Sequence, residues 1–582
     1  MKDKSAYVQL ITPDGERLMK DRDAIPWDVY PRPSLERKNW ICLNGYWDFA
    51  IKKPNEATEY QRKIRVPFPV ESVLSGIGER VPRNGVLCYR KEFSIPKTNG
   101  RVILHFGAVD QVAEVYVNGE RQATHEGGYE HFSYDVTDCL RDVNVLEVLV
   151  TDALHEKVLP YGKQCEKRGG MWYTPVTGIW QTVWLECVPT NYIRKLTLQT
   201  DTAGASLSVE MSGELADGTV YLEEDGAVST FPIANGHARI DVKNPVFWSP
   251  ENPHLYRVAV EVGEDRVESY FALRTLDIRE VNGVRRLCLN GKPYFFHGLL
   301  DQGYFSDGIF LPASPEGFEA DILAAKRLGF NMLRKHIKLE PEQFYYDCDR
   351  LGMVVFQDMV NNGDYSFLRD TALPTVGVKR MDDRRLHRDR KTREAFLDGM
   401  KKTVRQLAHH PCVCYWTIFN EGWGQFDHAS AYKLLKGLDS TRFIDSVSGW
   451  FLPPRGRELQ SDVESSHVYF KPVRLQASDK PLVLSEFGGY SYKLMEHSFN
   501  LVKTYGYRSI ASQREFEDAL ETLYTTEVLP AIQIGLCASV YTQLTDVEDE
   551  TNGLLTYDRR REKVDAEKMR RIADALYEEI QK

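Results

Sequence analysis

Two apolar runs in this chain each lead to a glutamate, and this feature constrains the fold most. Residues 412–419 are largely apolar and lead through Asn420 to Glu421, and residues 481–485 lead directly to Glu486. Each run is apolar on both faces and too short for a helix, which is typical of a buried parallel strand. In a barrel of alternating strands and helices, side chains at the carboxyl ends of the strands face the active site. The pattern therefore predicts two carboxylates at one end of such a barrel.

Two carboxylates presented in this way suit the cleavage of a glycosidic bond. One carboxyl group then acts as the acid, and the other acts as the base or the nucleophile. A single glutamate after a strand is more often a carboxylate in the first turn of a helix. The pairing of Glu421 with Glu486 favours the catalytic interpretation over this structural one.

Composition and charge exclude several classes of protein. A length of 582 residues predicts three or four domains. The net charge of −10 argues against a nucleic-acid binder, and because no run of 18 apolar residues occurs, we expect no membrane span. Residues 1–7 lack the apolar segment of a signal peptide, and the ten cysteines are scattered through strand-like segments. We therefore expect reduced thiols and a cytoplasmic protein without a disulfide framework.

The first half of the chain is predicted to be β structure. Residues 35–190 show short apolar alternations and frequent turn residues, and the pair Asn118-Gly119 is a hairpin signal that allows residues 121–124 to return as the next strand. A β-sandwich satisfies this pattern. Residues 191–280 show the same alternation and turns over a length that matches a small immunoglobulin-like sandwich.

From residue 282 the pattern changes to alternating strands and helices. After a hairpin at residues 287–292, we expect eight strands, at residues 294–300, 330–334, 353–356, 413–419, 443–447, 463–469, 482–484 and 536–544. The clearest helices are expected at residues 315–328, 392–408, 511–529 and 565–581. This alternation predicts a (β/α)8 barrel, with a long polar loop at residues 361–390.

Several motifs resemble glycoside hydrolase family 2, the family of β-galactosidases, β-glucuronidases and β-mannosidases. They are Leu-Asn-Gly-Tyr-Trp-Asp-Phe at 43–49, Thr-Gly-Ile-Trp-Gln-Thr-Val-Trp-Leu at 177–185 and Leu-Asn-Gly-Lys-Pro at 289–293. The resemblance covers nearly the whole chain. It implies a jelly-roll sugar-binding-like domain over residues 1–190, an immunoglobulin-like β-sandwich over 191–281 and a catalytic (β/α)8 TIM barrel over 282–582.

The resemblance also implies roles for the two glutamates. The family places an Asn-Glu acid/base at the end of strand four and a glutamate nucleophile at the end of strand seven, which are Asn420-Glu421 and Glu486 here. The family retains the anomeric configuration, which requires the carboxyl groups to lie about 5–5.5 Å apart. Asn420 is then expected to bind the 2-hydroxyl of the sugar. No cofactor is needed for this chemistry.

Other candidate substrate-binding residues follow the predicted strands. Each has an alternative structural role, in strand packing, helix capping or buried ion pairing. They are Asp301 after strand one, Arg334 and His336 after strand two, Asp358 after strand three, Trp423 after strand four, and His467 and Tyr469 after strand six. By the resemblance, Tyr469 is also expected to contact the nucleophile.

The substrate stays open at this point. The Asn-x-Lys-Gly signature of β-glucuronidases and the Glu-x-His metal motif of large β-galactosidases are both absent, so we expect no metal site. The first expectation is a β-galactosidase, and β-mannosidase, β-glucosidase, arabinosidase and uronidase are the alternatives. A transglycosylase, or a non-catalytic carbohydrate-binding protein on the same scaffold, also fits. The partner is a small carbohydrate, and a homo-oligomer is compatible with the sequence.

Two aromatic loop segments of the first domain bear on the mode of action. Residues 161–163 and 171–173 lie in a glycine-rich stretch and can reach the mouth of the barrel. If they close it, single sugars are removed from non-reducing ends. The alternative is that these aromatic side chains only pack the domain interface.

Overall fold

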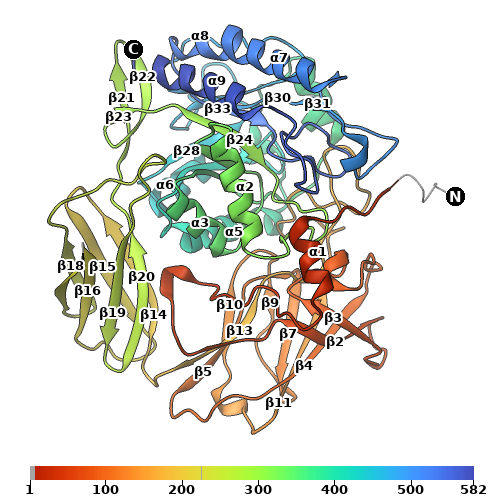
Figure 1. Cartoon of the computed structure of the whole chain (residues 1–582), viewed down its shortest axis with the longest axis vertical. Coiled ribbons are helices and arrows are strands. Elements are labelled where there is room, and N and C mark those ends of the chain that lie inside the picture. The colour runs from red at the N-terminus through yellow and green to blue at the C-terminus, as the bar shows by residue number, and fades with distance from the viewer. Residues whose placement is uncertain (1–6, 225) are drawn as a thin grey trace.

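The computed structural model of the chain describes residues 7–224 and 226–582. Residues 1–6, on which most of the signal-peptide expectation rests, lie outside the described residues. Figure 1 shows two β-sandwiches, coloured orange and yellow-green, on one side of a green-to-blue barrel. The helix α1 (Pro13–Lys20) precedes the first sandwich and lies between it and the barrel.

The first sandwich consists of two antiparallel sheets. One sheet has the order β1 (Trp40–Cys42), β13 (Val183–Val188), β5 (Arg101–Phe106), β10 (Phe132–Asp135). The other has the order β3 (Arg62–Val66), β2 (Gly45–Lys52), β4 (Val86–Phe93), β11 (Asn144–Thr151), β7 (Val112–Val117), β8 (Glu120–Arg121). Asn118 and Gly119 both have positive φ, at 52° and 83°, as the predicted hairpin turn requires. The returning strand is β8, which covers Glu120–Arg121. It is shorter than the predicted strand at residues 121–124 and begins one residue earlier.

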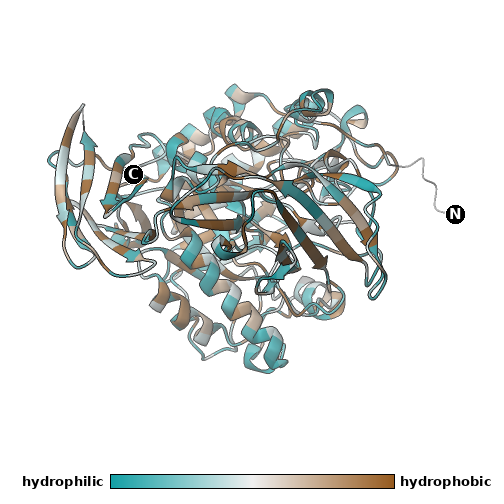
Figure 2. Ribbon diagram, turned by 90° about the horizontal axis from the view of Figure 1, so that it is seen from below, coloured by the Kyte–Doolittle hydropathy of each residue, from teal (hydrophilic) through white to brown (hydrophobic). Residues whose placement is uncertain are grey.

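The second sandwich also consists of two sheets. Its sheets have the orders β14 (Ile193–Thr200), β15 (Gly204–Met211), β18 (His237–Asp241) and β17 (Ala227–Ile233), β16 (Gly218–Glu224), β19 (Tyr256–Val262), β20 (Asp265–Phe271). In β19 buried apolar residues alternate with more exposed ones, because one face of each sheet covers the core. Figure 2 shows this alternation as brown and teal along the strands.

The barrel follows a hairpin formed by β21 (Leu276–Val281), β22 (Val284–Leu289) and β23 (Lys292–Pro293). All eight predicted barrel strands are present and pair in parallel: β24 (Phe296–Asp301), β25 (Met332–Lys335), β26 (Val354–Asp358), β27 (Val413–Asn420), β28 (Phe443–Ser448), β29 (Glu464–Val468), β30 (Leu482–Gly488) and β33 (Leu536–Thr542). The predicted fold class is therefore confirmed.

The sheet order runs from β28 through β24 and β33 to β29, so the seam between β28 and β29 carries no ladder. Side-chain and loop bonds bridge this seam instead. Ser465 Oγ donates to the carbonyl of Val447, at 3.2 Å, and the amide of Asp462 donates to the carbonyl of Ile444, at 2.9 Å. The barrel is thus nearly closed, and the carboxyl ends of its strands meet at one mouth.

Helices surround the barrel strands. They are α2 (Glu316–Arg327), α3 (Glu342–Leu351), α5 (Arg390–Leu407), α6 (His428–Leu438), α7 (Gln513–Leu523), α8 (Leu529–Ile532) and α9 (Ala566–Glu579). The helix predicted over residues 511–529 is divided, because a π-helical segment (Tyr524–Val528) joins α7 to α8. The predicted loop at 361–390 contains the π-helix η5 (Phe367–Ala372), α4 (Leu373–Thr375) and a 3-10 turn at Asp383–Arg385.

The predicted domain boundaries at residues 190/191 and 281/282 stay predictions. All ten cysteines are free, as expected from their scatter. Within the described part of the chain, none of the helices combines the length and the apolar character needed to cross a membrane.

Candidate active site

Two strand ends at the barrel mouth carry the glutamates predicted from the sequence. Glu421 follows β27 directly, and Glu486 lies in β30. Their side chains are 12% and 7% exposed. An oxygen of each carboxyl group and a ring nitrogen of His467 all lie within 4.8 Å of one another. The structure therefore brings together the two carboxylates that sequence reasoning paired.

A tight turn after β27 orients the side chain of Glu421 toward His467. Its φ is +49°, in the left-handed region that side chains other than glycine rarely adopt, and the following Gly422 has φ +74°. A Cβ on Gly422 would lie 1.9 Å from the ring of Phe451, so only glycine fits there. The amide of Glu421 donates to the carbonyl of Ser448, at 2.8 Å, and this bond ties the turn to β28.

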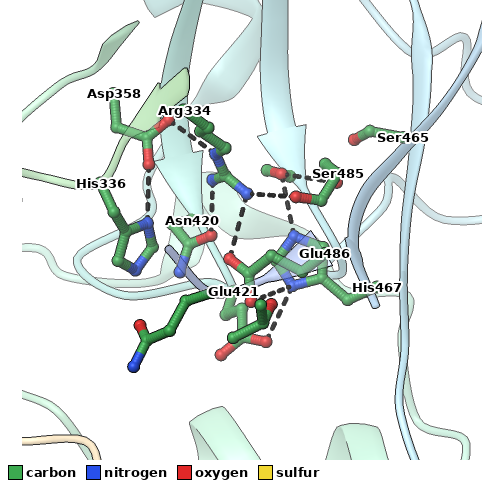
Figure 3. A network of polar contacts seen from close by, with 12 residues as sticks. Arg334, His336, Asp358, Asn420, Glu421, Ser465, His467, Ser485 and Glu486 are labelled. Carbon is green, nitrogen blue, oxygen red and sulfur yellow. Dashed lines mark hydrogen bonds and ion pairs between the residues drawn. The ribbon is translucent and has the colours of Figure 1, made fainter. Parts of the chain in front are cut away.

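Arg334 lies at the centre of the polar network in Figure 3 and is 1% exposed. Its guanidinium donates to Asp358 Oδ1 at 3.0 Å, to Glu486 Oε1 at 3.0 Å and to Asn420 Oδ1 at 2.9 Å. A rigid fork of five donors suits such a junction. Arg334 therefore orients the candidate nucleophile and its neighbours. The Nδ2 group of Asn420 is buried without a partner among the described residues, so it is free to donate to a sugar hydroxyl.

His467 lies between the two glutamates. Its Nδ1 atom is 2.8 Å from Glu421 Oε1 and 3.5 Å from Glu486 Oε2. Its Nε2 atom is 3.0 Å from Ser448 Oγ. Burial lowers the pKa of His467 to about 3, so the ring is neutral near pH 7. The sequence predicted a sugar contact for His467, and the structure places it against both carboxyl groups.

The two carboxyl groups have different electrostatic surroundings. Burial raises the pKa of Glu421 to about 7, against the opposing charges of Lys163, Arg334 and Lys379. Burial also raises the pKa of Glu486, although the positive charge of Arg334 opposes this shift. Glu486 accepts a direct bond from Arg334, and the hydrogen bonds of Glu421 in the structure include none from a cation. The bond from Arg334 favours an anion at Glu486, and the raised pKa of Glu421 suits a proton donor there.

Tyr469 contacts the candidate nucleophile, as the family resemblance predicted. Its hydroxyl donates to Glu486 Oε2 at 2.8 Å and lies 2.7 Å from Thr542 Oγ1. The ring of Tyr507 stacks on Tyr469 with centroids 3.7 Å apart. These contacts fix the second oxygen of the Glu486 carboxylate.

His336 joins the network through Asp358, and Asp301 does not join it. Nδ1 of His336 lies 2.8 Å from Asp358 Oδ2. Asp301 is paired in register with Lys335, and their side chains form an ion pair of 2.5 Å. Because side chains alternate along a strand, Lys335 points to the face opposite Arg334. Asp301 therefore lies apart from the carboxylate pair, and its predicted sugar contact receives no support from this placement.

The first sandwich reaches the barrel mouth, as the loop segments at residues 161–163 and 171–173 suggested. The rings of Trp172 and Trp423 lie 5.2 Å apart, and Tyr365 of the barrel approaches Trp423 at 5.9 Å. The hydroxyl of Tyr161 donates to the carbonyl of Gly363 at 2.8 Å. Trp423 thus lies in an aromatic group built from both domains.

Sequence reasoning missed several residues around the carboxylates. They lie in loops of the barrel or of the first sandwich. The charges of Lys163, Lys379 and Glu550 act on groups of the site, and the ring of Tyr507 stacks on Tyr469. Only Lys163 lay in a segment that the sequence had marked as a rim loop. Glu550 follows the last barrel strand, and this position in the sequence could have marked it as a candidate site residue.

Few residues of the site could hold a metal ion, which the sequence did not predict. Within residues 7–224 and 226–582, the group of suitable ligands is Glu421, His467 and Glu486. A cation held there would occupy both carboxyl groups proposed for catalysis. Asp358 offers no alternative, because Arg334 and His336 engage both of its oxygens.

Comparison with known proteins places these observations in a family. Three domain models match: "Glycosyl hydrolases family 2, TIM barrel domain" over residues 280–560, "Glycosyl hydrolase 2 galactose-binding domain-like" over residues 83–199, and "Glycosyl hydrolases family 2" over residues 192–274. Together they cover most of the second sandwich, the barrel strands and the part of the first sandwich from β4 onward.

Curated relatives carry two activities in their names. The chain is 25% identical over 436 residues to a β-galactosidase of Thermoanaerobacter pseudethanolicus, covering 69% of this chain and 54% of that protein. It is 26% identical over 488 residues to a β-glucuronidase of Canis lupus familiaris, covering 72% of this chain and 70% of that protein. The chain therefore spans about half of the first relative and somewhat more than two thirds of the second.

Solved structures share the fold. A β-D-glucuronidase of Dictyoglomus thermophilum superposes with a TM-score of 0.70 at 20% identity, covering 95% of this chain and 98% of that one. A β-galacturonidase of Eisenbergiella tayi bound to galacturonate superposes with a TM-score of 0.66 at 18% identity, covering 95% of this chain and 99% of that one. At such identities the likeness shows the fold alone.

Proposed function

The chain belongs to glycoside hydrolase family 2, and we propose that it is a retaining, exo-acting β-glycosidase with terminal β-galactosides as its first substrate class. The observation that carries the proposal is the buried carboxyl pair Glu421 and Glu486, whose nearest oxygens lie within 4.8 Å. Retaining enzymes hold their carboxyl groups about 5–5.5 Å apart, whereas inverting enzymes need about 6.5–9.5 Å to admit a water.

The first chemical step uses both glutamates. Glu486, held by Arg334 and Tyr469, attacks the anomeric carbon while Glu421 donates its proton to the departing glycosidic oxygen. A bond forms between the anomeric carbon and Glu486 as the bond to the leaving group breaks. Because burial raises the pKa of Glu421 to about 7, it carries the required proton below that pH.

The second step releases the sugar. Glu421, now deprotonated, takes a proton from water, and the resulting nucleophile displaces Glu486 from the anomeric carbon. In both steps Asn420 donates its free Nδ2 group to the 2-hydroxyl, a contact that strengthens in the transition state. His467 holds the acid/base between steps through its 2.8 Å contact with Glu421.

A labelling experiment tests the assignment of the nucleophile. Glu486→Gln should lower kcat on an aryl β-galactoside by roughly four orders of magnitude, because the nucleophile's attack is lost. Mass spectrometry after treatment with a 2-fluoro-galactoside inactivator should place the label on Glu486 of the wild-type protein. Labelling of another residue, or a Glu486→Gln variant of wild-type activity, would refute the proposal.

The exo-acting part of the proposal rests on the contact between the first sandwich and the barrel mouth. The rings of Trp172 and Trp423 lie 5.2 Å apart, so loops of the two domains are in contact near Glu421. This contact would close one side of the site. Thin-layer chromatography of a β-linked galacto-oligosaccharide digest should show galactose from the earliest time points. Mid-length fragments appearing before galactose would show internal cleavage and contradict this part.

A further inference from the structure

Among the residues that the structure describes, one buried lysine differs from the other buried lysines in having no carboxylate partner. Four lysines among the described residues are buried: Lys163, Lys335, Lys338 and Lys563. Lys335 pairs with Asp301 at 2.5 Å, Lys338 with Glu340 at 2.8 Å, and Lys563 with Asp546 at 2.7 Å.

Lys163 is 6% exposed, and its ammonium makes no hydrogen bond or ion pair within the part of the chain that the structure describes. The loop of the first sandwich instead places it over an indole ring of the barrel. The Nζ atom lies 4.6 Å from the centroid of Trp423, which follows the candidate acid/base by two residues. A cation–π contact offsets only part of the cost of burying a charge. The ammonium thus has no acceptor among the described residues and lies over the ring two residues beyond the candidate acid/base, so its donors can serve a ligand in the site.

Glu550 is the carboxylate that acts most strongly on Lys163. Burial lowers the pKa of Lys163, and the carboxylate of Glu550 opposes this shift more than those of Glu486 and Glu421 do. Glu550 is 4% exposed, and its Oε2 accepts from Gln543 Nε2 at 2.6 Å. No cation of the described residues lies within 4.0 Å of it, so the pair is separated rather than closed into a salt bridge.

We propose that Lys163 and Glu550 determine the sugar specificity of this site by forming hydrogen bonds with hydroxyl groups of a neutral glycon. Lys163 donates to one hydroxyl oxygen, and Glu550 accepts from a hydroxyl of the same sugar. The inference rests on the proposed function and deepens it, because it assigns the substrate class as uncharged hexosides rather than uronosides. The two residues come from different domains, so the specificity is set across the interface.

Charge decides between a neutral and an anionic sugar. A lone buried lysine would attract a uronate carboxylate. Here Glu550 and Glu486 act on the same ammonium, and burial raises the pKa of Glu550 to about 7, so above that pH a third carboxylate would meet two anions. Like charges brought together at a binding site cost several kcal/mol. A neutral sugar avoids this cost, and its hydroxyl groups can still accept from the Lys163 ammonium and donate to the Glu550 carboxylate.

Binding of free sugars tests the inference without requiring turnover. We would titrate D-galactose and D-galacturonate by isothermal calorimetry into the wild type and into Lys163→Met and Glu550→Gln. The control is Lys157→Met, a lysine of the same loop that lies over the ring of Tyr161 at 5.9 Å. Galactose should bind the wild type at least tenfold more tightly than galacturonate.

The variants should separate the two contacts. Lys163→Met should weaken galactose binding by roughly 10- to 100-fold, since hydrogen bonds to charged groups contribute about 1.5–3 kcal/mol. Glu550→Gln should weaken galactose binding and strengthen galacturonate binding, and Lys157→Met should change neither. Lys163→Met should not lower the midpoint of thermal unfolding, because it removes an unpaired buried charge.

Three results would overturn the inference: galacturonate binding the wild type as tightly as galactose, equal losses for both sugars in Glu550→Gln, or no binding of either sugar. These results concern binding alone. A wild type that binds galactose in the expected pattern but hydrolyses no β-glycoside would refute the proposed function and leave only the sugar-binding roles of Lys163 and Glu550.

Discussion

Replacing Arg334 with methionine is the sharpest test of how this site controls its nucleophile. The side chain is 1% exposed and holds Asp358, Glu486 and Asn420 at 2.9–3.0 Å. Methionine preserves most of the apolar volume and removes the charge. Two buried carboxylates then lose their cation while the surrounding strands stay in place.

The expected magnitude follows from these contacts. A neighbouring cation at this distance lowers a carboxyl pKa by about 1–3 units, so its removal raises the pKa of Glu486 by a similar amount. The nucleophile must be ionised, and the acid limb of the pH–rate profile therefore moves to higher pH by about 1–3 units. Loss of roughly 3–4 kcal/mol of transition-state stabilisation lowers kcat/KM at the optimum by about 10²–10³.

The assay is the pH dependence of kcat/KM on an aryl β-galactoside, with Arg442→Met as a matched control. Arg442 is 6% exposed, pairs with Asp439 at 2.8 Å and donates to the carbonyl of Val413 at 2.7 Å, at the start of β27. Both variants should be destabilised, and only Arg334→Met should shift the profile. An unmoved acid limb, or equal losses of kcat/KM in the two variants, would refute the reasoning.

Three further outcomes are expected. Glu421→Ala should lose most activity on substrates with poor leaving groups, and azide should restore part of the rate; equal losses for all leaving groups would make Glu421 structural. In the wild type, kcat/KM should fall as pH rises through about 7, because the raised pKa of Glu421 sets the loss of its proton; a flat profile to pH 9 would contradict this. Activity should survive dialysis against EDTA, since Arg334 and His336 occupy both oxygens of Asp358; a loss restored by magnesium would reveal a metal site.

Much of the barrel could be predicted because its signals are local. A strand buried on both faces must be apolar throughout, so residues 413–419 and 482–484 were recognisable without a partner in view. The glutamates at their ends followed from the rule that strand ends face the active site. Candidates at the other strand ends followed in the same way, and of these the structure places Arg334 and Tyr469 against Glu486.

Other parts of the prediction depended on contacts that no local pattern encodes. Asp301 ends a barrel strand as a site residue would, but its register opposite Lys335 turns it to the other face. The position of His467 between the two glutamates was not foreseen, and its predicted sugar contact stays a prediction. A shift of one residue in strand register reverses the face of a side chain, and spacing alone does not fix register.

The sequence by itself thus determined the fold class and the identity of the carboxylate pair, because hydrophobic period and strand length are properties of single segments. Only the tertiary structure decided what surrounds that pair. Lys163 and Glu550 lie in loops of different domains, and their meeting beside Glu486 depends on how the first sandwich packs on the barrel. Loops carry no hydrophobic period, so their positions are set by the packed elements that they connect.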